Sequence, residues 1–316
     1  MTSASVNSKT DNKKRSSTEK SIDRGFIWLT AILAVAIAGV LVWIAIQVGI
    51  QAVPAIKEFG LSFLTGSSWN PPEKQYAILP MIYGTVVSSL IALLIAFPVG
   101  VACAIVLSEN FLPKSARRTL VFLVELLAAI PSVVYGLWGI YVLIPFLKPI
   151  GRFLHDNLGW FPLFATNYVG PGMLPAGVIL SIMILPLITA IARDSLASLP
   201  ENLRAGSYAV GSTRWQTIFS VLIPAAFSGI VGGTMLALGR ALGETMAATL
   251  VIGNSNDLNF SILAPANTIA SLMANQFSEA SGLQRQSLMY AGLVLFAITL
   301  VVNIIAEAII QQVKKY

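Results

Sequence analysis

Residues 75–108 read QYAILPMIYGTVVSSLIALLIAFPVGVACAIVLS and contain no charged side chain. Charge returns only at Lys74 before the stretch and at Glu109 after it. An apolar run of this length exceeds the ~20 residues that an α-helix needs to cross the ~30 Å hydrocarbon core of a bilayer. The stretch therefore predicts a membrane-spanning helix near residues 80–107.

Similar uncharged runs recur along the chain, each closed by charged residues. The 316-residue chain is 56% hydrophobic and only 11% charged, whereas a soluble domain is about a quarter charged. This composition excludes a cytosolic enzyme, a disordered chain and a secreted disulfide scaffold, and it predicts an all-α integral membrane protein with six transmembrane helices. The predicted spans are 26–50, 80–107, 119–145, 173–192, 225–252 and 287–313.

The runs also divide the chain into regions. Residues 1–24 are polar and rich in Ser, Thr and Lys, which indicates a disordered basic tail. Residues 25–79 are predicted to form the first transmembrane anchor and an external segment. We interpret the first span as an uncleaved anchor, because it exceeds the ~7–15 residues of a signal-peptide apolar core. Residues 80–313 are predicted to form the main transmembrane domain, which includes a polar loop at 193–224.

The distribution of basic residues predicts the orientation. Assigning the loops alternately to two sides of the membrane places 14 Lys and Arg residues on one side and 5 on the other. Because basic residues concentrate in cytoplasmic loops, both termini are predicted to be cytoplasmic. Topology thus accounts for most of the net charge of +6. No basic stripe is interleaved with aromatic residues, so we expect membrane lipid as a partner and no nucleic acid.

The loop at 193–224 carries helical signals. Pro200 can start one short helix, and Gly211 interrupts it. Thr213 and Gln216 have the spacing of a capping box, which predicts a second helix. An apolar stripe in this second helix suits either insertion into a partner's groove or an interfacial position on the membrane, and the residues alone leave both open. The stripe consists of Trp215, Ile218, Phe219 and Leu222, and Pro224 follows it.

Arg240 and Glu244 are charged residues within the fifth predicted span. In a continuous helix they would share one face, one turn apart. Arg240 would lie roughly 18–24 Å along the span, beyond the middle of a ~30 Å core. Because such a charge costs about 2.5–3.5 kcal/mol on insertion scales, it usually faces a cavity or a partner. A translocation path and a structural ion pair are the two interpretations of the pair.

The chemistry of this pair suits an oxyanion. Arginine stays charged and donates two hydrogen bonds from a planar fork, which fits phosphate. Glu244 could neutralise Arg240 in an empty path, or accept a hydrogen bond from a protonated phosphate oxygen, which sulfate lacks. Two four-residue repeats of small residues surround the pair and predict close helix packing. One repeat is Gly229, Gly233, Ala237 and Ala241, and the other is Gly239, Gly243 and Ala247.

The polar loop resembles the EAA loop of type-1 ABC-transporter permeases. AGSYAVG at 205–211, nine further residues and VLIP at 221–224 match its spacing, although Ala205 replaces the acidic first residue of the pattern. The resemblance implies the MetI-like permease fold and a pair of coupling helices that dock on a separate ATPase. It assigns this docking to Ala205, Gly206, Ser207, Gly211, Thr213, Trp215 and Pro224.

Three further stretches are similar to the PstC family of phosphate ABC-transporter permeases. They are residues 239–254, residues 69–85 and IPSVVYG at 130–136, and the likeness extends over residues 59–313. It implies a permease subunit of an ATP-driven importer that moves inorganic phosphate across the bacterial inner membrane by alternating access. Its implied partners are a PstA-like sister permease, a homodimeric PstB-like ATPase and an external PstS-like phosphate-binding protein. Arg240 and Glu244 match residues linked to transport in that family.

The chain lacks the motifs of an enzyme. The dipeptide Gly-Lys is missing, so there is no Walker A sequence, and neither HExxH nor GxSxG occurs. We therefore expect no cofactor or metal in this chain, with ATP and Mg bound by the partner ATPase. The alternative function is a secondary anion transporter in which an intramembrane carboxylate, Glu244 or Glu125, carries protons. Against it stand the unexplained polar loop and the lack of an internal repeat.

Overall fold

The computed structural model describes residues 17–313, most of them in α-helices. Within this range six helical segments are long and apolar enough to cross a membrane, which confirms the predicted number of spans. Of the predicted tail, residues 1–16 lie outside the described residues and the rest belongs to α1. The six segments are Asp23–Phe59, Leu79–Ser108, Ser132–Leu158, Met173–Ala197, Arg214–Leu242 and Gly282–Gln312.

The first helix, α1, extends over Ser17–Phe59. The chain divides into two compact units, and the boundary falls within this helix, between Ile50 and Gln51. In the first unit the large apolar side chains from Phe26 to Ile46 are exposed, and none of the most apolar window is buried. Such a surface has the composition of a helix whose side chains face lipid.

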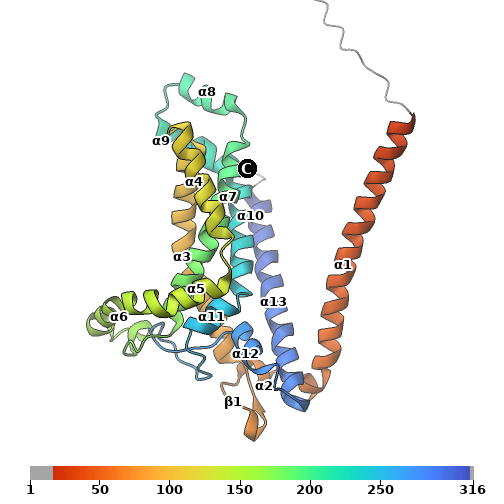
Figure 1. The fold of residues 1–316 in the computed structure, drawn as a ribbon, viewed down its shortest axis with the longest axis vertical. Helices are drawn as coiled ribbons and strands as arrows, with labels where there is room; N and C mark the ends of the chain where they lie inside the picture. The colour runs from red at the N-terminus through yellow and green to blue at the C-terminus, as the bar shows by residue number, and fades with distance from the viewer. Residues whose placement is uncertain (1–16, 314–316) are drawn as a thin grey trace, which may run out of the picture. The chain divides into compact units, whose positions relative to one another are not determined.

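In the second unit, α3 (Leu79–Ser108) and α7 (Met173–Ala197) form the central pair of the bundle (Figure 1). A Cβ atom added at Gly100 of α3 would lie 2.9 Å from Ile188 Cγ2 of α7, so the glycine allows the two helices to approach closely. Buried aliphatic side chains of α7, among them Ile179 and Ile184, fill the core between them. Two further helices, α10 (Ile223–Leu242) and α13 (Gly282–Val313), complete this side of the bundle.

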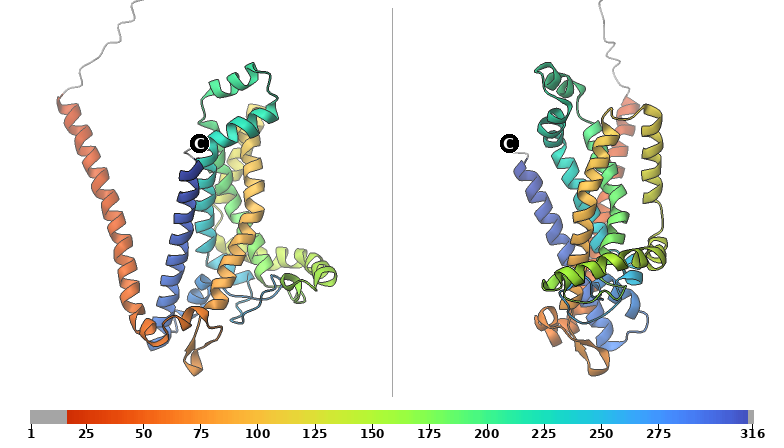
Figure 2. Two further views of the ribbon diagram at one scale, coloured as in Figure 1. Left: turned by 180° about the vertical axis from the view of Figure 1, so that it is seen from behind. Right: turned by 90° about the vertical axis from the view of Figure 1, so that its left-hand side faces the viewer.

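The third predicted span, 119–145, has the wrong bounds. Helix α4 ends at Ala128, and the chain turns at Pro131 before α5 begins at Ser132. Proline lacks an N–H and disfavours helix in the residue before it, an effect that apolar content alone does not reveal. Figures 1 and 2 show α4 along the bundle and the following segment running across it. These elements are α4 (Lys114–Ala128), α5 (Ser132–Trp138), η2 (Gly139–Leu143) and α6 (Ile144–Leu158).

Two π-helical turns, η2 (Gly139–Leu143) and η4 (Ile218–Leu222), interrupt the long helices. Each of them lies just before a proline, Pro145 or Pro224. The amide of the residue preceding the proline donates five residues back, as from Ile223 N to Ile218 O. Because proline cannot donate the usual i→i−4 bond, the helix adjusts by widening one turn.

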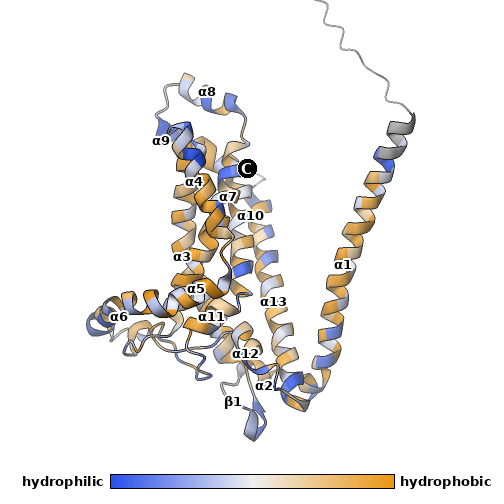
Figure 3. Cartoon of the chain, viewed as in Figure 1, coloured by the Kyte–Doolittle hydropathy of each residue, from blue (hydrophilic) through white to orange (hydrophobic). Residues whose placement is uncertain are grey.

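The second unit has two distinct ends (Figures 1 and 2). The loop end holds α8 (Glu201–Ala209) and α9 (Arg214–Thr217), and α13 finishes there. The hairpin end holds strands β1 (Trp69–Asn70) and β2 (Gln75–Tyr76), which are antiparallel with Trp69 opposite Tyr76. Figure 3 shows hydrophilic residues on α8, α9 and the hairpin, and apolar residues along the helices between them. The short elements near the hairpin end are α2 (Ser62–Thr65), η1 (Pro71–Glu73), η3 (Pro162–Phe164), α11 (Met246–Val251) and α12 (Ile269–Gln276).

An aromatic core organises the hairpin end. Phe63 stacks on Tyr290 of α13 with ring centroids 4.3 Å apart, and Trp69 meets Tyr76 edge-on at 5.1 Å. The indole N–H of Trp69 donates to Gln276 Oε1 at 2.8 Å, so its polar atom is satisfied although the ring is buried. These contacts anchor the segment before α3 to α12 and α13.

Candidate functional site

The polar loop forms the two short helices expected from the sequence, α8 and α9, with Gly211 between them. Gly211 has φ of +84°, a left-handed conformation, and an added Cβ would meet no atom within 4 Å. Backbone conformation is therefore the reason for glycine at this position. The Gly211 amide donates to Tyr208 O at 3.0 Å and closes the turn after α8.

The predicted capping box at the start of α9 is confirmed. The Thr213 hydroxyl accepts from Gln216 N at 3.3 Å, and Gln216 Oε1 accepts from Thr213 N at 2.8 Å. Both bonds satisfy amides that a helix N-terminus leaves unpaired. Through η4 and Pro224, α9 continues directly into α10, so one helical segment extends over Arg214–Leu242. A displacement of α9 therefore acts directly on α10.

The apolar stripe of this segment divides into two pairs. Ile218 and Leu222 are each 1% exposed and belong to the core at the loop end, whereas Trp215 is 56% exposed and Phe219 60%. The two exposed rings stack with centroids 5.9 Å apart. The stripe thus anchors the segment on one side and presents an aromatic surface on the other.

Hydrogen bonding joins the two loop helices. The buried Ser207 hydroxyl lies 2.9 Å from Thr217 Oγ1, and the Ser212 amide donates to Ser207 O at 3.3 Å. Ala205 and Gly206 are exposed on α8. Ala205 also borders a polar cavity of about 530 Å³ at the loop end. The lining of this cavity comprises Glu109, Asn110, Glu201, Arg204, Ala205, Tyr208 and Arg214.

Arg240 and Glu244 do not share a helical face, which corrects the prediction from their spacing. Helix α10 ends at Leu242, and Glu244 lies in the break before α11 begins at Met246. Glu244 Oε1 accepts a hydrogen bond from Ala247 N at 3.2 Å, so the carboxylate satisfies an amide in the first turn of α11. Glycine lowers the helix propensity around this break, and a hydropathy pattern does not register that effect.

Arg240 is exposed in the last turn of α10 and forms no ion pair with any residue in the described range 17–313. Tyr135 of α5 lies within electrostatic range of its guanidinium. The Tyr135 hydroxyl donates to Leu127 O, near the end of α4, at 2.8 Å. Sequence reasoning missed Tyr135, although it lies within the IPSVVYG stretch that carries the family resemblance. Tyr135 thus bonds to the end of α4 and lies near Arg240 in the last turn of α10.

The small-residue repeats of α10 have different surroundings. Gly233 packs against α7, where an added Cβ would lie 2.6 Å from Ile191 Cγ2, so the prediction of close packing is confirmed for this repeat. An added Cβ at Gly239 would meet nothing within 4 Å, and Leu236 on the same side is 60% exposed. We call the side of α10 that carries Gly232, Leu236, Gly239 and Arg240 the open face. The charged side chain therefore lies where the chain itself leaves α10 uncovered.

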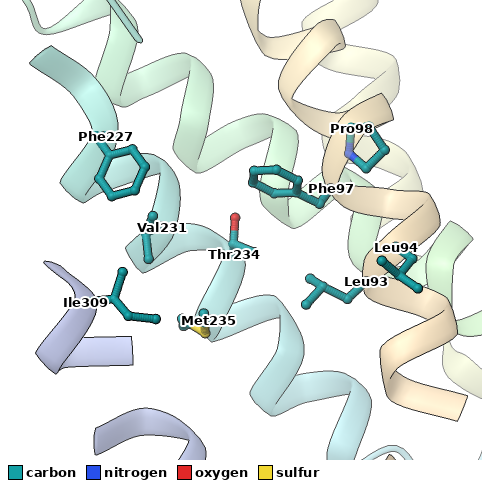
Figure 4. A pocket seen from close by; sticks show the side chains of 9 residues that line it. All are labelled: Leu93, Leu94, Phe97, Pro98, Phe227, Val231, Thr234, Met235 and Ile309. Carbon is teal, nitrogen blue, oxygen red and sulfur yellow. The ribbon is translucent and has the colours of Figure 1, made fainter. Parts of the chain in front are cut away.

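An apolar groove of about 520 Å³ is lined by residues of α3, α10 and α13 (Figure 4). The Thr234 hydroxyl is the one polar side-chain group in its lining, and it donates to Ile230 O at 2.7 Å within its own helix. The groove therefore offers no charge or free donor to an anion. Its lining consists of Leu93, Leu94, Phe97, Pro98, Phe227, Val231, Thr234, Met235 and Ile309.

Carboxylates elsewhere in the bundle are engaged in local contacts. Glu125 of α4 pairs with Arg193 at 3.7 Å, and Arg193 also bonds Asp194 at 2.8 Å. The Glu307 carboxylate accepts from Gln311 Nε2 at 3.1 Å. No group of three or more His, Cys, Asp or Glu side chains that could hold a metal occurs among the described residues.

Comparison with known proteins gives a consistent result. A family model described as a binding-protein-dependent transport system inner membrane component matches residues 96–315. The phosphate transport system permease protein PstC of Mesorhizobium japonicum is 46% identical over 265 residues, covering 82% of this chain and 81% of the relative. The PstC protein of Haemophilus influenzae is 41% identical over 299 residues, covering 93% and 95%.

The fold also matches solved structures. A chain in the crystal structure of a bacterial alginate ABC transporter, in complex with an alginate pentasaccharide-bound periplasmic protein, superposes with a TM-score of 0.63. The alignment covers 94% of this chain and 98% of the other, at 18% identity. Likeness at this identity concerns the fold alone, and it confirms the expected type-1 ABC permease architecture.

Proposed function

Because this chain belongs to the binding-protein-dependent transport system inner membrane components, and within them to the PstC phosphate transport permeases, we propose that it conducts inorganic phosphate. It is a multi-pass membrane protein and a permease subunit of an ABC importer, not an enzyme. Its proposed location is the bacterial inner membrane, with both termini in the cytoplasm. The excess of basic residues on the predicted cytoplasmic side, which includes the loop end, supports this orientation.

The observation that carries the proposal is Arg240 on the open face of α10. A guanidinium within a membrane span is costly unless a partner or water-filled space receives it. No described carboxylate neutralises Arg240, and the glycine beside it allows another group to approach. Its fork can donate two hydrogen bonds to a phosphate oxyanion without a change of protonation state. We place the phosphate path along this face.

Glu244 has a second role in the proposal. One of its carboxylate oxygens accepts from Ala247 N, and the other has no hydrogen-bond partner among the described residues. A free carboxylate oxygen can accept a hydrogen bond from the protonated oxygen of HPO₄²⁻, but not from sulfate, which carries no proton near neutral pH. Glu244 would thereby favour phosphate over sulfate.

The open face and the exposed aromatic pair indicate where partners would bind. We propose that a PstA-like sister permease covers the open face of α10, so that the path lies between the two permeases. A homodimeric PstB-like ATPase, which binds ATP and Mg, would dock on the loop end at Trp215 and Phe219. An external PstS-like protein would deliver phosphate to the opposite, hairpin end.

In the proposed mechanism, closure of the ATPase dimer moves α9, and α10 moves with it because the two are one helical segment. The open face then alternates between outward and inward access. The covalent continuity of α9 with α10 supports this mechanism, since it requires no separate linkage between the docking surface and Arg240.

The test is phosphate uptake by the complete complex in proteoliposomes. Arg240→Ala should abolish uptake, while the complex of this chain with the sister permease, the ATPase dimer and the phosphate-binding protein still assembles. Arg118→Ala is a matched control, because Arg118 is an exposed arginine on α4 that forms no ion pair or side-chain hydrogen bond among the described residues. Normal uptake by the Arg240→Ala complex would refute the assignment of the path.

A further inference from the structure

The connection between α3 and α4, residues 109–113, contains a buried charge. Glu109 is the one charged residue among the buried residues of the described chain. It is also the C-cap of α3, where the helix dipole disfavours a negative charge. Burial and position both disfavour the carboxylate, so its surroundings must compensate for it.

Arg204 of α8 provides that compensation. Its Nη2 lies 2.8 Å from Glu109 Oε1, and its Nε donates to both carboxylate oxygens at 3.3 Å. The same guanidinium donates to Leu196 O at 2.9 Å and to Leu199 O at 3.2 Å, at and just beyond the end of α7. Carbonyls at a helix C-terminus lack partners and attract cations. Arg204 therefore fastens α8 to the ends of both α3 and α7.

The same connection also contacts α9. The Arg214 guanidinium lies 3.6 Å from the centroid of the Phe111 ring, a cation–π distance. Trp215 packs on Phe111 with centroids 5.5 Å apart. Phe111 itself rests against the apolar core at the loop end. Residues 109–113 thus touch both loop helices, one through an ion pair and the other through an aromatic ring.

We propose that residues 109–113 are a brace that couples the loop helices to the α3–α7 pair, with Glu109 and Phe111 as positioning residues. The proposal rests on the proposed function and extends it. Helix α9 is continuous with α10, so the two move together. Helix α8 is joined to α7 only through the turn at residues 198–200. The Glu109–Arg204 pair supplies the missing link, so that a displacement of α8 moves α3 and α7 together with α10.

If residues 109–113 act as a brace, substitutions there should weaken the coupling of phosphate uptake to ATP hydrolysis, and not only the stability of the complex. The test measures phosphate uptake and ATP hydrolysis on the same proteoliposomes, which contain the complete complex. Glu109→Gln keeps the side-chain shape but removes the charge. We expect ATP hydrolysis to persist and phosphate moved per ATP to fall about fivefold or more. Glu109→Asp, which keeps the charge, should restore part of this ratio.

The matched control is Glu125→Gln. Like Glu109, Glu125 pairs with an arginine, in its case Arg193 of α7. Glu125 is 57% exposed, however, and Arg193 would still pair with Asp194 in the variant. Because this pair joins α4 to α7 and contacts neither loop helix, the ratio of phosphate to ATP should match the wild type.

Substitutions of Phe111 provide a second, independent test. Phe111→Leu keeps an apolar side chain but removes the aromatic face, whereas Phe111→Trp keeps the face. The brace predicts a lowered phosphate-to-ATP ratio for leucine and a near-normal ratio for tryptophan.

Three outcomes would overturn the brace, and a fourth would overturn the proposed function. Wild-type ratios in both Glu109→Gln and Phe111→Leu would overturn the brace, and so would a fall in the amount of assembled complex with an unchanged ratio. Equal ratios for leucine and tryptophan at position 111 would also overturn it. If the wild-type complex moved no phosphate, the proposed function itself would fail, which is a separate result.

Discussion

Arg204 at the loop end and Arg240 in the α10 segment have contrasting surroundings. Arg204 is 19% exposed and uses its guanidinium to bond one carboxylate and two backbone carbonyls. Arg240 is exposed and has no ion pair among residues 17–313. An arginine bonded through all three of its nitrogens fixes the elements around it, whereas one without an ion pair retains its donors for a ligand.

The carboxylates of the two regions differ in the same sense. Glu109 is 8% exposed, and both of its oxygens accept from Arg204. Glu244 is less buried and accepts one described hydrogen bond, from the backbone of Ala247. Thus Glu109 and Arg204 are joined by hydrogen bonds although they are far apart in sequence, whereas Arg240 and Glu244 are close in sequence but form no ion pair.

The strongest test of this contrast is at Arg240. Two charge-assisted hydrogen bonds of about 1.5–3 kcal/mol each would be lost in Arg240→Ala, so uptake should fall at least about a hundredfold. Arg240→Lys keeps the charge without the fork and should remain about tenfold below the wild type. Initial rates of phosphate uptake measure both. Equal rates for lysine and arginine would contradict the bidentate role.

At Arg204 the expected effect is on stability. Arg204→Ala would leave the Glu109 carboxylate buried and unpaired, which costs about 3–5 kcal/mol for a buried pair. The double variant Arg204→Ala/Glu109→Gln should recover part of that loss, because no charge then remains buried. Thermal unfolding of the purified complex measures the difference. No recovery in the double variant would show that the α7 carbonyl bonds, not the ion pair, dominate.

The contrast predicts a change of selectivity at Glu244. Glu244→Gln retains an oxygen that can cap Ala247 N, so the fold should persist. Loss of the charged acceptor should reduce the preference for phosphate over sulfate by about tenfold, the effect of ~1.4 kcal/mol. Competition of sulfate with labelled phosphate uptake provides the measurement. Unchanged selectivity would leave Glu244 with its capping role alone.

The smallest effect is expected at the turn between the loop helices. Gly211→Ala places a Cβ in a left-handed conformation, at a cost of about 1–2 kcal/mol. Gly206→Ala is the matched control, because Gly206 lies within α8 and an added Cβ meets no atom within 4 Å. The melting temperature of the complex should fall for position 211 and stay level or rise for position 206. The opposite order would show that conformation does not select glycine at 211.

The sequence was sufficient for features encoded locally. The number of spans follows from uncharged runs, and the capping box follows from Thr213 and Gln216, three residues apart. The breaks at Pro131 and Gly243 were missed, because an apolar pattern continues through both while the backbone does not. The Glu109–Arg204 pair joins residues 95 positions apart. Neither residue is unusual in its own stretch, so only the folded chain reveals the contact.

The π-helical turn before Pro224 has a geometric consequence. One additional residue in a helix advances every later side chain by about 100° around the axis. The widened turn at Ile218–Leu222 lies between the exposed aromatic pair and the open face. It therefore sets the phase between Trp215 and Arg240, the angle at which one surface is presented relative to the other. The same sequence wound as an unbroken α-helix would keep both surfaces but would rotate Arg240 away from the side on which phosphate is proposed to pass.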